Sequence, residues 1–543
     1  MSNRILFYAL FAIFLASMFS DQIQTSWGRV HVQEITIPTQ NGQWLVADLF
    51  KPRTATAENP APLVVVVPGF QRSKETLSNL SIELSRRGIV VMAIDPYAQG
   101  GSSSSMSTRA ATKEGYGMFA IVEYTHDTPN MNYVDKKRIG ATGHSAGGLA
   151  AIRGAQYFGK IAKKENTVSK LQSVFVSGMV RMGFKEKNLK NIRSNVGMSY
   201  ALYDEGAWQN ELQHGDMKNA PEATRLVNSG RFKTEDPIES INIGYYYGDI
   251  DQRTSRVVYN EKTLHPFQPY SLGAMANQID YFLKVFGVES AISSKNQTWY
   301  WKEILTLISL VSSFLLVLPL ARLFLDIPFF RSLVYDVPDP LPKPRGRGKA
   351  VFWFLFGFSA VVACLSYIPL SELSKTLFFE ASNRHQTWFF PQRMNNAVML
   401  WALLNGSIGL LLFFANYHFF GRNNGIHPEM WGIEINLKEL AKTILLGLVI
   451  FFCYFLVLYL IYYIFHVDYR FIFIGVRKFR PVMLALLPMY MPFFFVFFFS
   501  NSLRVNGAMR FDGRQGWPGM LLGAAANTLG LFMILVVQYL AFG

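Results

Sequence analysis

The sequence contains little cysteine. Its two cysteines, Cys364 and Cys453, both lie in apolar segments of the C-terminal half. A disulfide framework is therefore excluded for the N-terminal half, and this absence neither supports nor contradicts export of that half. The sequence also lacks a cluster of histidines and cysteines at the spacing that metal ligands need. We expect neither a metal nor a cofactor.

Charged residues are scarce as well, at 16% of the chain, but basic residues outnumber acidic ones and give a formal net charge of +15. No nucleic-acid recognition motif accompanies this charge, and much of it flanks apolar segments. The charge therefore predicts contact with anionic lipid rather than with nucleic acid.

Long hydrophobic runs are abundant after residue 302. Runs near the roughly 20 residues that a bilayer-spanning helix needs occur at about 303–321, 350–370, 395–417, 440–465, 481–500 and 518–541. Trp299 and Trp301 before the first run and Trp517 before the last suit the aromatic belt of a membrane interface. We therefore expect an all-α membrane domain at 302–543 with about six transmembrane helices.

A shorter apolar segment, 5–19, opens the chain behind Arg4. It is either a signal peptide or an uncleaved signal anchor within residues 1–20, and the lack of a small-x-small cleavage site favours the anchor. If Arg4 stays inside the cell, the region that follows is exported. Basic residues in the short loops favour the same orientation, so we expect an integral, multi-pass membrane protein with residues 28–292 on the extracytoplasmic side.

Residues 28–292 have the pattern of alternating strands and helices. The continuous β-branched run 62–67 and the run 89–94 predict buried parallel strands, with a helix at 73–87 between them. Further strands are expected at 43–50, 173–177 and 241–247, and a helix at 272–286. Strands that alternate with helices imply a doubly wound, mainly parallel sheet.

The most informative motif is Gly143-His144-Ser145-Ala146-Gly147, which follows a strand and leads into a helix. This arrangement is typical of a nucleophile elbow, in which glycines flank the serine because neighbouring chains pack closely there. The stretch 133–148 resembles the α/β-hydrolase superfamily, particularly its dienelactone-hydrolase-like and serine esterase or peptidase branches. The resemblance covers roughly residues 30–290.

The resemblance implies a triad in the chain order serine, acid, histidine. Two histidines, His214 and His265, follow Ser145 within this domain, and only His265 follows an acid at the end of an expected strand. The family's usual Gly-x-x-Asp turn favours Asp251 as the acid, with Asp249 as the alternative. Without the resemblance to this family, the simplest interpretation is that Ser145 and Asp251 are ordinary turn residues and that His265 is a surface residue.

The resemblance also places the oxyanion hole on the backbone N–H groups of Phe70 and Ala146. An insertion at about 180–235 resembles a helical lid, and its basic segment 181–193 would suit an anionic or lipid-linked substrate. A charged, solvated helix is the equally simple alternative for that segment.

The sequence thus predicts a membrane-embedded serine hydrolase that cleaves a small-molecule or lipid ester through an acyl-enzyme on Ser145. An acyltransferase with the same triad is the first alternative, because these motifs do not determine whether water or another nucleophile accepts the acyl group. The second is a membrane transporter or sensor whose hydrolase-like domain only binds a ligand. The oligomeric state has no signal in the sequence.

Overall fold

The computed structural model describes residues 2–107, 110–181, 183–231, 236–383, 385, 387–433, 436–470, 481–511 and 516–542. These residues form two compact units. Unit 1 comprises Met1–Leu323 and Leu448–Lys478, and unit 2 comprises Phe324–Gly447 and Phe479–Gly543.

Unit 1 contains an eight-stranded sheet with the order β1-β2-β4-β3-β5-β6-β7-β8. All strands from β4 to β8 pair in parallel, whereas β2 pairs antiparallel with both β1 and β4. The carboxyl ends of the parallel strands therefore meet at one edge, where α/β sheets place their sites. The strands are β1 (Val30–Pro38), β2 (Trp44–Pro52), β3 (Ala61–Val67), β4 (Val90–Ile94), β5 (Val134–His144), β6 (Ser173–Ser177), β7 (Asn195–Ala201) and β8 (Arg256–Glu261).

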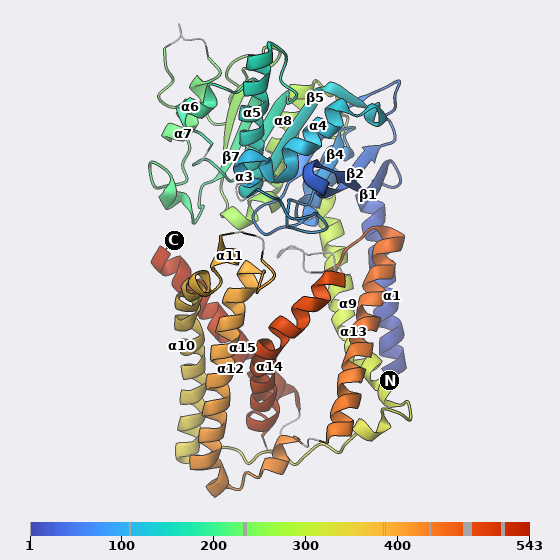
Figure 1. Ribbon diagram of the computed structural model, residues 1–543, viewed down its shortest axis with the longest axis vertical. Coiled ribbons are helices and arrows are strands. Elements are labelled where there is room, and N and C mark those ends of the chain that lie inside the picture. Colours follow the sequence, from blue (N-terminus) through green and yellow to red (C-terminus); the bar gives the residue numbers. More distant parts are fainter. Residues whose placement is uncertain are drawn as a thin grey trace. The chain divides into compact units, whose positions relative to one another are not determined.

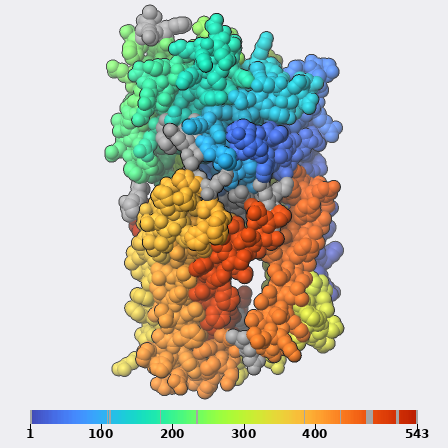
Figure 2. Space-filling view, in the orientation of Figure 1, coloured from blue at the N-terminus to red at the C-terminus, as the bar shows by residue number. Residues whose placement is uncertain are grey.

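Helices cover both faces of this sheet. The buried residues of α4 (Met118–Asp127) and α5 (Ala146–Glu165) join one hydrophobic cluster, and those of α2 (Ser78–Ser85) and α8 (Leu272–Phe286) join the other. In the view of Figure 1, α4 and α5 lie in front of the strands, and their side chains cover that face closely in Figure 2. Three further short helices are α3 (Ala110–Lys113), α6 (Glu186–Leu189) and α7 (Pro221–Asn228).

Most expected elements of the sheet are present with small shifts at their ends. The run 62–67 forms β3, 89–94 forms β4, and 173–177 and 272–286 match β6 and α8. The expected helix 73–87 forms as a 3₁₀ turn, Lys74–Leu77, followed by α2. These elements are predictable because their apolar runs are buried on both sides or on one face.

Two expectations for this region are wrong. Residues 241–247 are not a strand: Gly244 has a φ of 78°, and Tyr247 forms an isolated bridge with Arg256. The expected lid at 180–235 contains β7, which lies between β6 and β8 in the sheet. Among the described residues, the segment 202–255 is the long excursion between neighbouring strands, and it carries α7.

Three apolar helices belong to unit 1: α1 (Ser2–Gln24), most of α9 (Trp299–Leu325) and the second part of α13 (Leu437–Phe465). Ile13, Leu316 and Leu458, one from each helix, pack in a single hydrophobic cluster, and the helices lie side by side in Figure 1. The boundary expected at residue 302 therefore differs from the structural division, because α9 and half of α13 pack with the N-terminal part of the chain.

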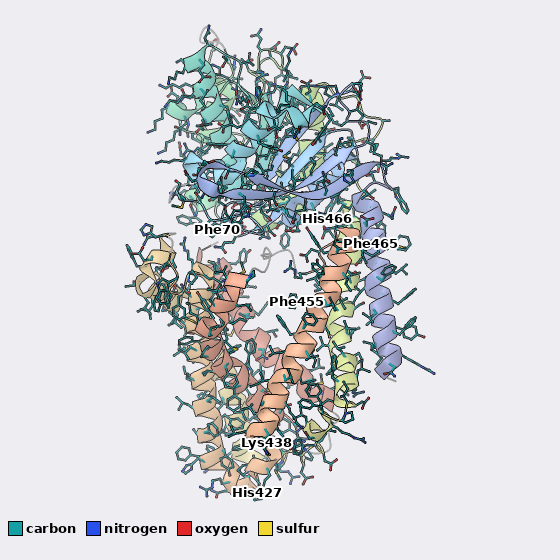
Figure 3. All side chains as sticks on the ribbon, turned by 45° about the vertical axis from the view of Figure 1, so that its right-hand side comes forward. Phe70, His427, Lys438, Phe455, Phe465 and His466 are labelled. Carbon is teal, nitrogen blue, oxygen red and sulfur yellow. The ribbon has the colours of Figure 1, made fainter. Side chains whose placement is uncertain are left out.

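The end of α13 is tied to the sheet by a buried ionic cluster. The Lys74 Nζ lies 2.9 Å from Asp48 Oδ1 and 3.0 Å from Glu75 Oε1, and His466 Nε2 contacts the same Asp48 oxygen at 3.0 Å. Figure 3 shows His466 at the end of α13, next to the sheet. Burial alone would raise the pKa of Asp48, but the charge of Lys74 and the hydrogen bond to His466 hold it below its usual range.

Unit 2 consists mainly of apolar helices. α10 and α12 pack together, α12 packs against α14, and α15 contacts both α10 and α14. Across the described residues of the whole chain, seven helices are long and apolar enough to span a membrane. The elements of unit 2 are α10 (Gly346–Leu377), α11 (Phe379–Ser382), α12 (Arg393–Asn416), α14 (Leu486–Ala508) and α15 (Gly516–Phe542).

Candidate active site

Ser145 occupies the turn between β5 and α5 in a strained backbone conformation. Its φ is 57° and its ψ is −116°, a region that residues with a side chain rarely adopt. The Ser145 N–H donates to the carbonyl oxygen of Ser177 at the end of β6, at 2.8 Å. The turn is thus fixed at the carboxyl edge of the sheet, with the serine half-buried above it.

The flanking glycines are required by close backbone contacts. A Cβ atom at Gly143 would lie 2.4 Å from the carbonyl oxygen of Val67, and one at Gly147 would lie 1.9 Å from the same oxygen. Both distances are far below van der Waals contact, so strand β3 passes too close for any side chain at either position. The Gly-x-Ser-x-Gly spacing therefore reflects the packing that a nucleophile elbow needs.

His265 follows β8 and pairs with Asp204, which follows β7. The His265 Nδ1 lies 2.8 Å from Asp204 Oδ2, and the other carboxylate oxygen accepts the N–H of Gly206 at 2.7 Å. The Asp204 side chain is 5% exposed and that of His265 is 24% exposed. A buried carboxylate therefore holds the imidazole, and Nε2 remains as the second ring nitrogen for chemistry.

The structure does not bring the expected acids to His265. Asp249 and Asp251 lie in an exposed turn before β8, and Asp249 Oδ1 accepts the N–H of Gln252. The carboxyl end of β8 leads to His265, so the two aspartates are at the opposite edge of the sheet. The expected pairing of His265 with Asp251, or with Asp249, is therefore replaced by a pairing with Asp204.

This error follows from the misassigned strand. The sequence pattern predicts 241–247 as the last strand before His265, so the expected acids are the aspartates in the turn after that segment, Asp249 and Asp251. The true strand β7 has a weaker sequence signal, since Gly197 and Ser199 interrupt its apolar run. The available clue was the turn Asp204-Glu205-Gly206, which follows a short run with Val196, Met198 and Tyr200 and precedes His265 in the required order.

His265 lies next to the elbow. The ring centroids of His144 and His265 are 4.5 Å apart. Within the described part of the chain, the Ser145 Oγ makes no hydrogen bond, so the serine and the imidazole of His265 are not hydrogen-bonded in this structure. Contacts of this kind are often loose in the absence of a substrate and tighten when one binds.

The predicted oxyanion donors flank the serine. Ala146 is the first residue of α5, so its N–H has no partner within the helix, and the positive end of the helix dipole adds to its effect. A Cβ at Gly69 would lie 3.6 Å from the Cβ of Ser145, so the loop that carries Phe70 passes directly beside this serine. The role of Phe70 and Ala146 as an oxyanion hole stays a prediction.

A buried polar network supports the loop that carries His265. Gln268 Nε2 donates to Ser199 Oγ at 2.8 Å, and Ser199 Oγ donates to Glu261 Oε1 at 3.2 Å. Glu261 also accepts from Asn277 at 2.9 Å. Burial raises the pKa of Glu261. These hydrogen bonds connect the turn that begins at His265 with β7, β8 and α8, and they hold this turn in position on the sheet.

His144 is held in its neutral form. Burial lowers its pKa well below the usual value, and the neighbouring His265 and Arg72 act in the same direction. Its Nε2 atom is buried and has no hydrogen-bond partner among the described residues. Its ring lies beside that of His265, with the two ring centroids 4.5 Å apart.

The described residues contain no group of three or more histidines, cysteines or acids that could hold a metal ion. The chemistry that this arrangement can perform is nucleophilic attack by a serine, assisted by an imidazole that a carboxylate orients.

A comparison with protein families bears on this geometry. Residues 19–173 match the family model of PET hydrolase-like proteins. The matched segment runs through β1–β5 and contains the elbow, and it ends at the first residue of β6, before Asp204 and His265. Together with the sheet order, this match shows an α/β-hydrolase fold in unit 1. None of the curated proteins compared with the chain matches it.

Solved structures similar to the chain include several esterases. A Pyrococcus furiosus esterase has 15% identity and a TM-score of 0.33, and the alignment covers 47% of this chain and 93% of that one. A bacterial heroin esterase has 14% identity and a TM-score of 0.33, covering 48% and 86%. An esterase from Pyrobaculum calidifontis has 17% identity and a TM-score of 0.31, covering 51% and 91%.

Exposed apolar side chains occur on the loops that follow the carboxyl ends of the parallel strands. Phe70 follows β3, Tyr203 and Trp208 follow β7, and Phe267 follows His265, and all four are exposed. Figure 3 shows Phe70 projecting from this carboxyl edge of the sheet. We call these four residues the apolar rim. Large exposed apolar groups that gather at one edge are typical of a binding surface.

Proposed function

We propose that this chain is a membrane-inserted serine hydrolase that cleaves carboxylic esters through an acyl-enzyme on Ser145. The observation that carries the proposal is the hydrogen-bonded pair of His265 with the buried Asp204, at the same edge of the sheet as a strained serine at a nucleophile elbow. A serine alone is a weak nucleophile near neutral pH, and an oriented imidazole supplies the base that it needs.

The reaction follows from these positions. His265 Nε2 removes the proton of Ser145 Oγ as the oxygen attacks the ester carbonyl carbon, and Asp204 stabilises the imidazolium through Nδ1–H. The N–H groups of Phe70 and Ala146 stabilise the oxyanion of the tetrahedral intermediate. His265 then gives its proton to the departing alcohol, and the acyl group stays on Ser145. Water, deprotonated by the same imidazole, releases the acid and restores the serine.

The apolar rim favours an ester with a hydrophobic acyl or alcohol part. Phe70, Trp208 and Phe267 offer apolar surface within the loops that surround Ser145, and burial of such surface contributes roughly 25 cal/mol per Å². Seven helices are long and apolar enough to span a membrane, and the lipid around such helices is a phase from which a hydrophobic substrate can come. We infer that the α/β-hydrolase domain is extracytoplasmic, because basic residues favour that orientation of the loops.

The test is hydrolysis of p-nitrophenyl esters, from acetate to decanoate, by the detergent-purified full chain. Ser145→Ala should reduce kcat/KM by about 10³-fold or more, because the covalent step is lost. Ser104→Ala, at an exposed serine outside the site, serves as the matched control and should retain full activity. A wild type without turnover on any ester, or a Ser145→Ala variant with full turnover, would overturn the proposal.

A further inference from the structure

Arg504 lies on α14 with its guanidinium among neutral partners. Its Nη2 donates to Asn501 Oδ1 at 2.6 Å and also to Asn527 Oδ1 on α15. The Nε atom is buried and has no partner among the described residues. No ion pair forms between Arg504 and any carboxylate in the part of the chain that the structure describes.

Two amide side chains that line the same region as Arg504 lie at the middle of their helices. Asn527 is near the centre of α15 (Gly516–Phe542), and Asn405, on the facing helix, is near the centre of α12 (Arg393–Asn416). Arg504 is on the last turns of α14, and its long side chain reaches the level of Asn527. If these helices span a membrane, as the proposed function requires, a cation lies in the hydrocarbon region with only neutral amides as partners. Such a residue is expensive there and usually marks a site.

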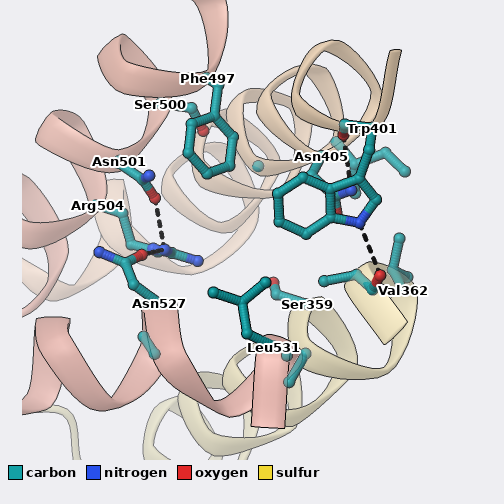
Figure 4. Close-up of a pocket in the computed structure, with 16 residues that line it drawn as sticks. Ser359, Val362, Trp401, Asn405, Phe497, Ser500, Asn501, Arg504, Asn527 and Leu531 are labelled. Carbon is teal, nitrogen blue, oxygen red and sulfur yellow. Dashed lines mark hydrogen bonds between the residues drawn. The ribbon is translucent and has the colours of Figure 1, made fainter. Parts of the chain in front are cut away.

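The guanidinium borders a cavity. The cavity has a volume of about 50 Å³ and lies between α10, α12, α14 and α15, and Figure 4 shows its lining. The polar part of the wall includes Ser359, Asn405, Ser500, Asn501, Arg504 and Asn527, and the apolar part includes Val362, Ile408, Phe497 and Leu531. The cavity therefore has a polar wall that carries a positive charge and an apolar wall beside it.

The polar wall favours an acceptor. Arg504 engages the carbonyl oxygens of both Asn501 and Asn527, so these amides have their NH₂ groups left as donors. The Oγ of Ser359 donates to the carbonyl oxygen of Leu355, and Asn405 Nδ2 donates to the carbonyl oxygen of Trp401 and to Ser366 Oγ. The amide donors left on this wall are therefore those of Asn501 and Asn527. The positive charge and the amide donors match an anionic oxygen, and an anion would also neutralise Arg504.

We propose that this cavity binds the carboxylate of an acyl-chain amphiphile, such as a free fatty acid, with Arg504 as the counter-charge. A volume of about 50 Å³ has room for a few water-sized groups, which suits a carboxylate rather than a phosphodiester with substituents on both sides. The apolar wall receives the first methylenes of the chain. The proposal rests on membrane insertion of the helices and does not depend on hydrolysis at Ser145.

The test is photolabelling of the full chain in nanodiscs with a diazirine analogue of palmitic acid, with adducts located by mass spectrometry. Adducts are expected on α10, α12, α14 or α15 near the cavity. Arg504→Gln should reduce this labelling roughly tenfold or more, since a charge-assisted hydrogen bond is lost. Arg504→Lys keeps the charge and should retain part of the labelling. Lys375→Gln, at an exposed lysine on α10, is the control for loss of one positive charge.

Competition on the unsubstituted chain needs no variant. Oleate should displace the probe, whereas methyl oleate, which has no charge, should not. Equal competition by methyl oleate, or undiminished labelling of a folded Arg504→Gln variant, would overturn the proposal. Displacement by acetate or inorganic phosphate at the concentration at which oleate competes would overturn the amphiphile in favour of a free anion. Ser145→Ala should label like the wild type, so loss of esterase activity and loss of this site are distinguishable.

Discussion

At the scale of the residue, the account depends on which carboxylate orients His265. Asp204 accepts from the imidazole at 2.8 Å and is nearly fully buried, whereas Asp251 is exposed at the other edge of the sheet. A buried carboxylate at this position fixes the tautomer that keeps Nε2 free to take a proton.

Replacement of this carboxylate should affect catalysis without affecting folding. Asp204→Asn is expected to reduce kcat/KM for ester hydrolysis by roughly 10²- to 10⁴-fold, because the imidazole loses its orientation and its counter-charge. Asp251→Asn, the matched control, should have the kcat/KM of the wild type. Equal losses in both variants, or a loss confined to Asp251→Asn, would show that the assignment of Asp204 is wrong.

His144 gives a second prediction at this scale, on pH dependence. Because its pKa is well below the usual value in the folded state, the unfolded chain binds more protons below about pH 6.5. The free energy of unfolding should therefore fall as the pH drops below 6.5, by up to about 1.4 kcal/mol per pH unit from this one group. His144→Gln should flatten that part of the profile, measured by urea unfolding between pH 4.5 and 7.5. An unchanged slope in the variant would contradict a buried neutral histidine.

The sequence predicts a strand–turn–helix unit with Ser145 between Gly143 and Gly147, because the elbow motif ties spacing to geometry, and the backbone has this turn between β5 and α5. The sequence does not predict Asp204. An aspartate in the turn after a strand is not part of a recognisable sequence motif, so it can be assigned only after that strand has been identified.

At the scale of the element, the strand–turn–helix unit around Ser145 depends on close packing against β3. The Val67 carbonyl oxygen lies against both Gly143 and Gly147, and the Ser145 N–H is bonded to the end of β6. The strained serine conformation persists because three strands and one helix hold it in place.

A methyl group at the elbow should disturb this unit. Gly147→Ala places a Cβ 1.9 Å from the Val67 carbonyl oxygen and should lower the free energy of unfolding by roughly 3 kcal/mol, with loss of ester hydrolysis. Gly273→Ala, on α8, is the control: its Cβ would meet one atom, at 3.9 Å, and should change stability by less than about 1 kcal/mol. A stable and active Gly147→Ala variant would be inconsistent with the packing described.

The elements that could be predicted are those with a regular pattern of burial: every residue of β3 is buried, and the buried residues of α8 recur at helical spacing. The continuous run of β3 and the helical periodicity of α8 have no competing interpretation. The segment 241–247 has strong β propensity, but Gly244 and Gly248 adopt positive φ values and Arg256–Glu261 takes the place beside β7. Tertiary competition for an edge position is not visible in local propensity.

At the scale of the whole molecule, the α/β-hydrolase domain and three apolar helices form one compact unit. The apolar runs predicted the helices themselves, but not that α9 and half of α13 would pack with the N-terminal part. That association depends on side chains far apart in sequence, including His466 with Asp48 and Tyr462 of α13 with Glu34.

Removal of the central cation should weaken this association. Lys74→Met removes the buried ammonium group that contacts Asp48, Glu75 and Glu34 and should lower the free energy of unfolding of unit 1 by about 3–5 kcal/mol at neutral pH. The loss should shrink as the pH falls below about 4, because the pKa of Asp48 is depressed by Lys74 and this contribution disappears in acid. Lys170→Met, in the exposed pair with Asp127, should cost about 1 kcal/mol or less. Similar losses for both variants would contradict a buried cluster.

The most direct measurement for the central claim is labelling of the detergent-purified full chain with a fluorophosphonate probe, with the adduct located by mass spectrometry. The account predicts one adduct on Ser145 that is absent in Ser145→Ala. It also predicts labelling roughly 10²-fold slower or more in His265→Ala, because the imidazole activates the serine. A folded wild type that does not label at Ser145, or a His265→Ala variant that labels at the wild-type rate, would contradict it.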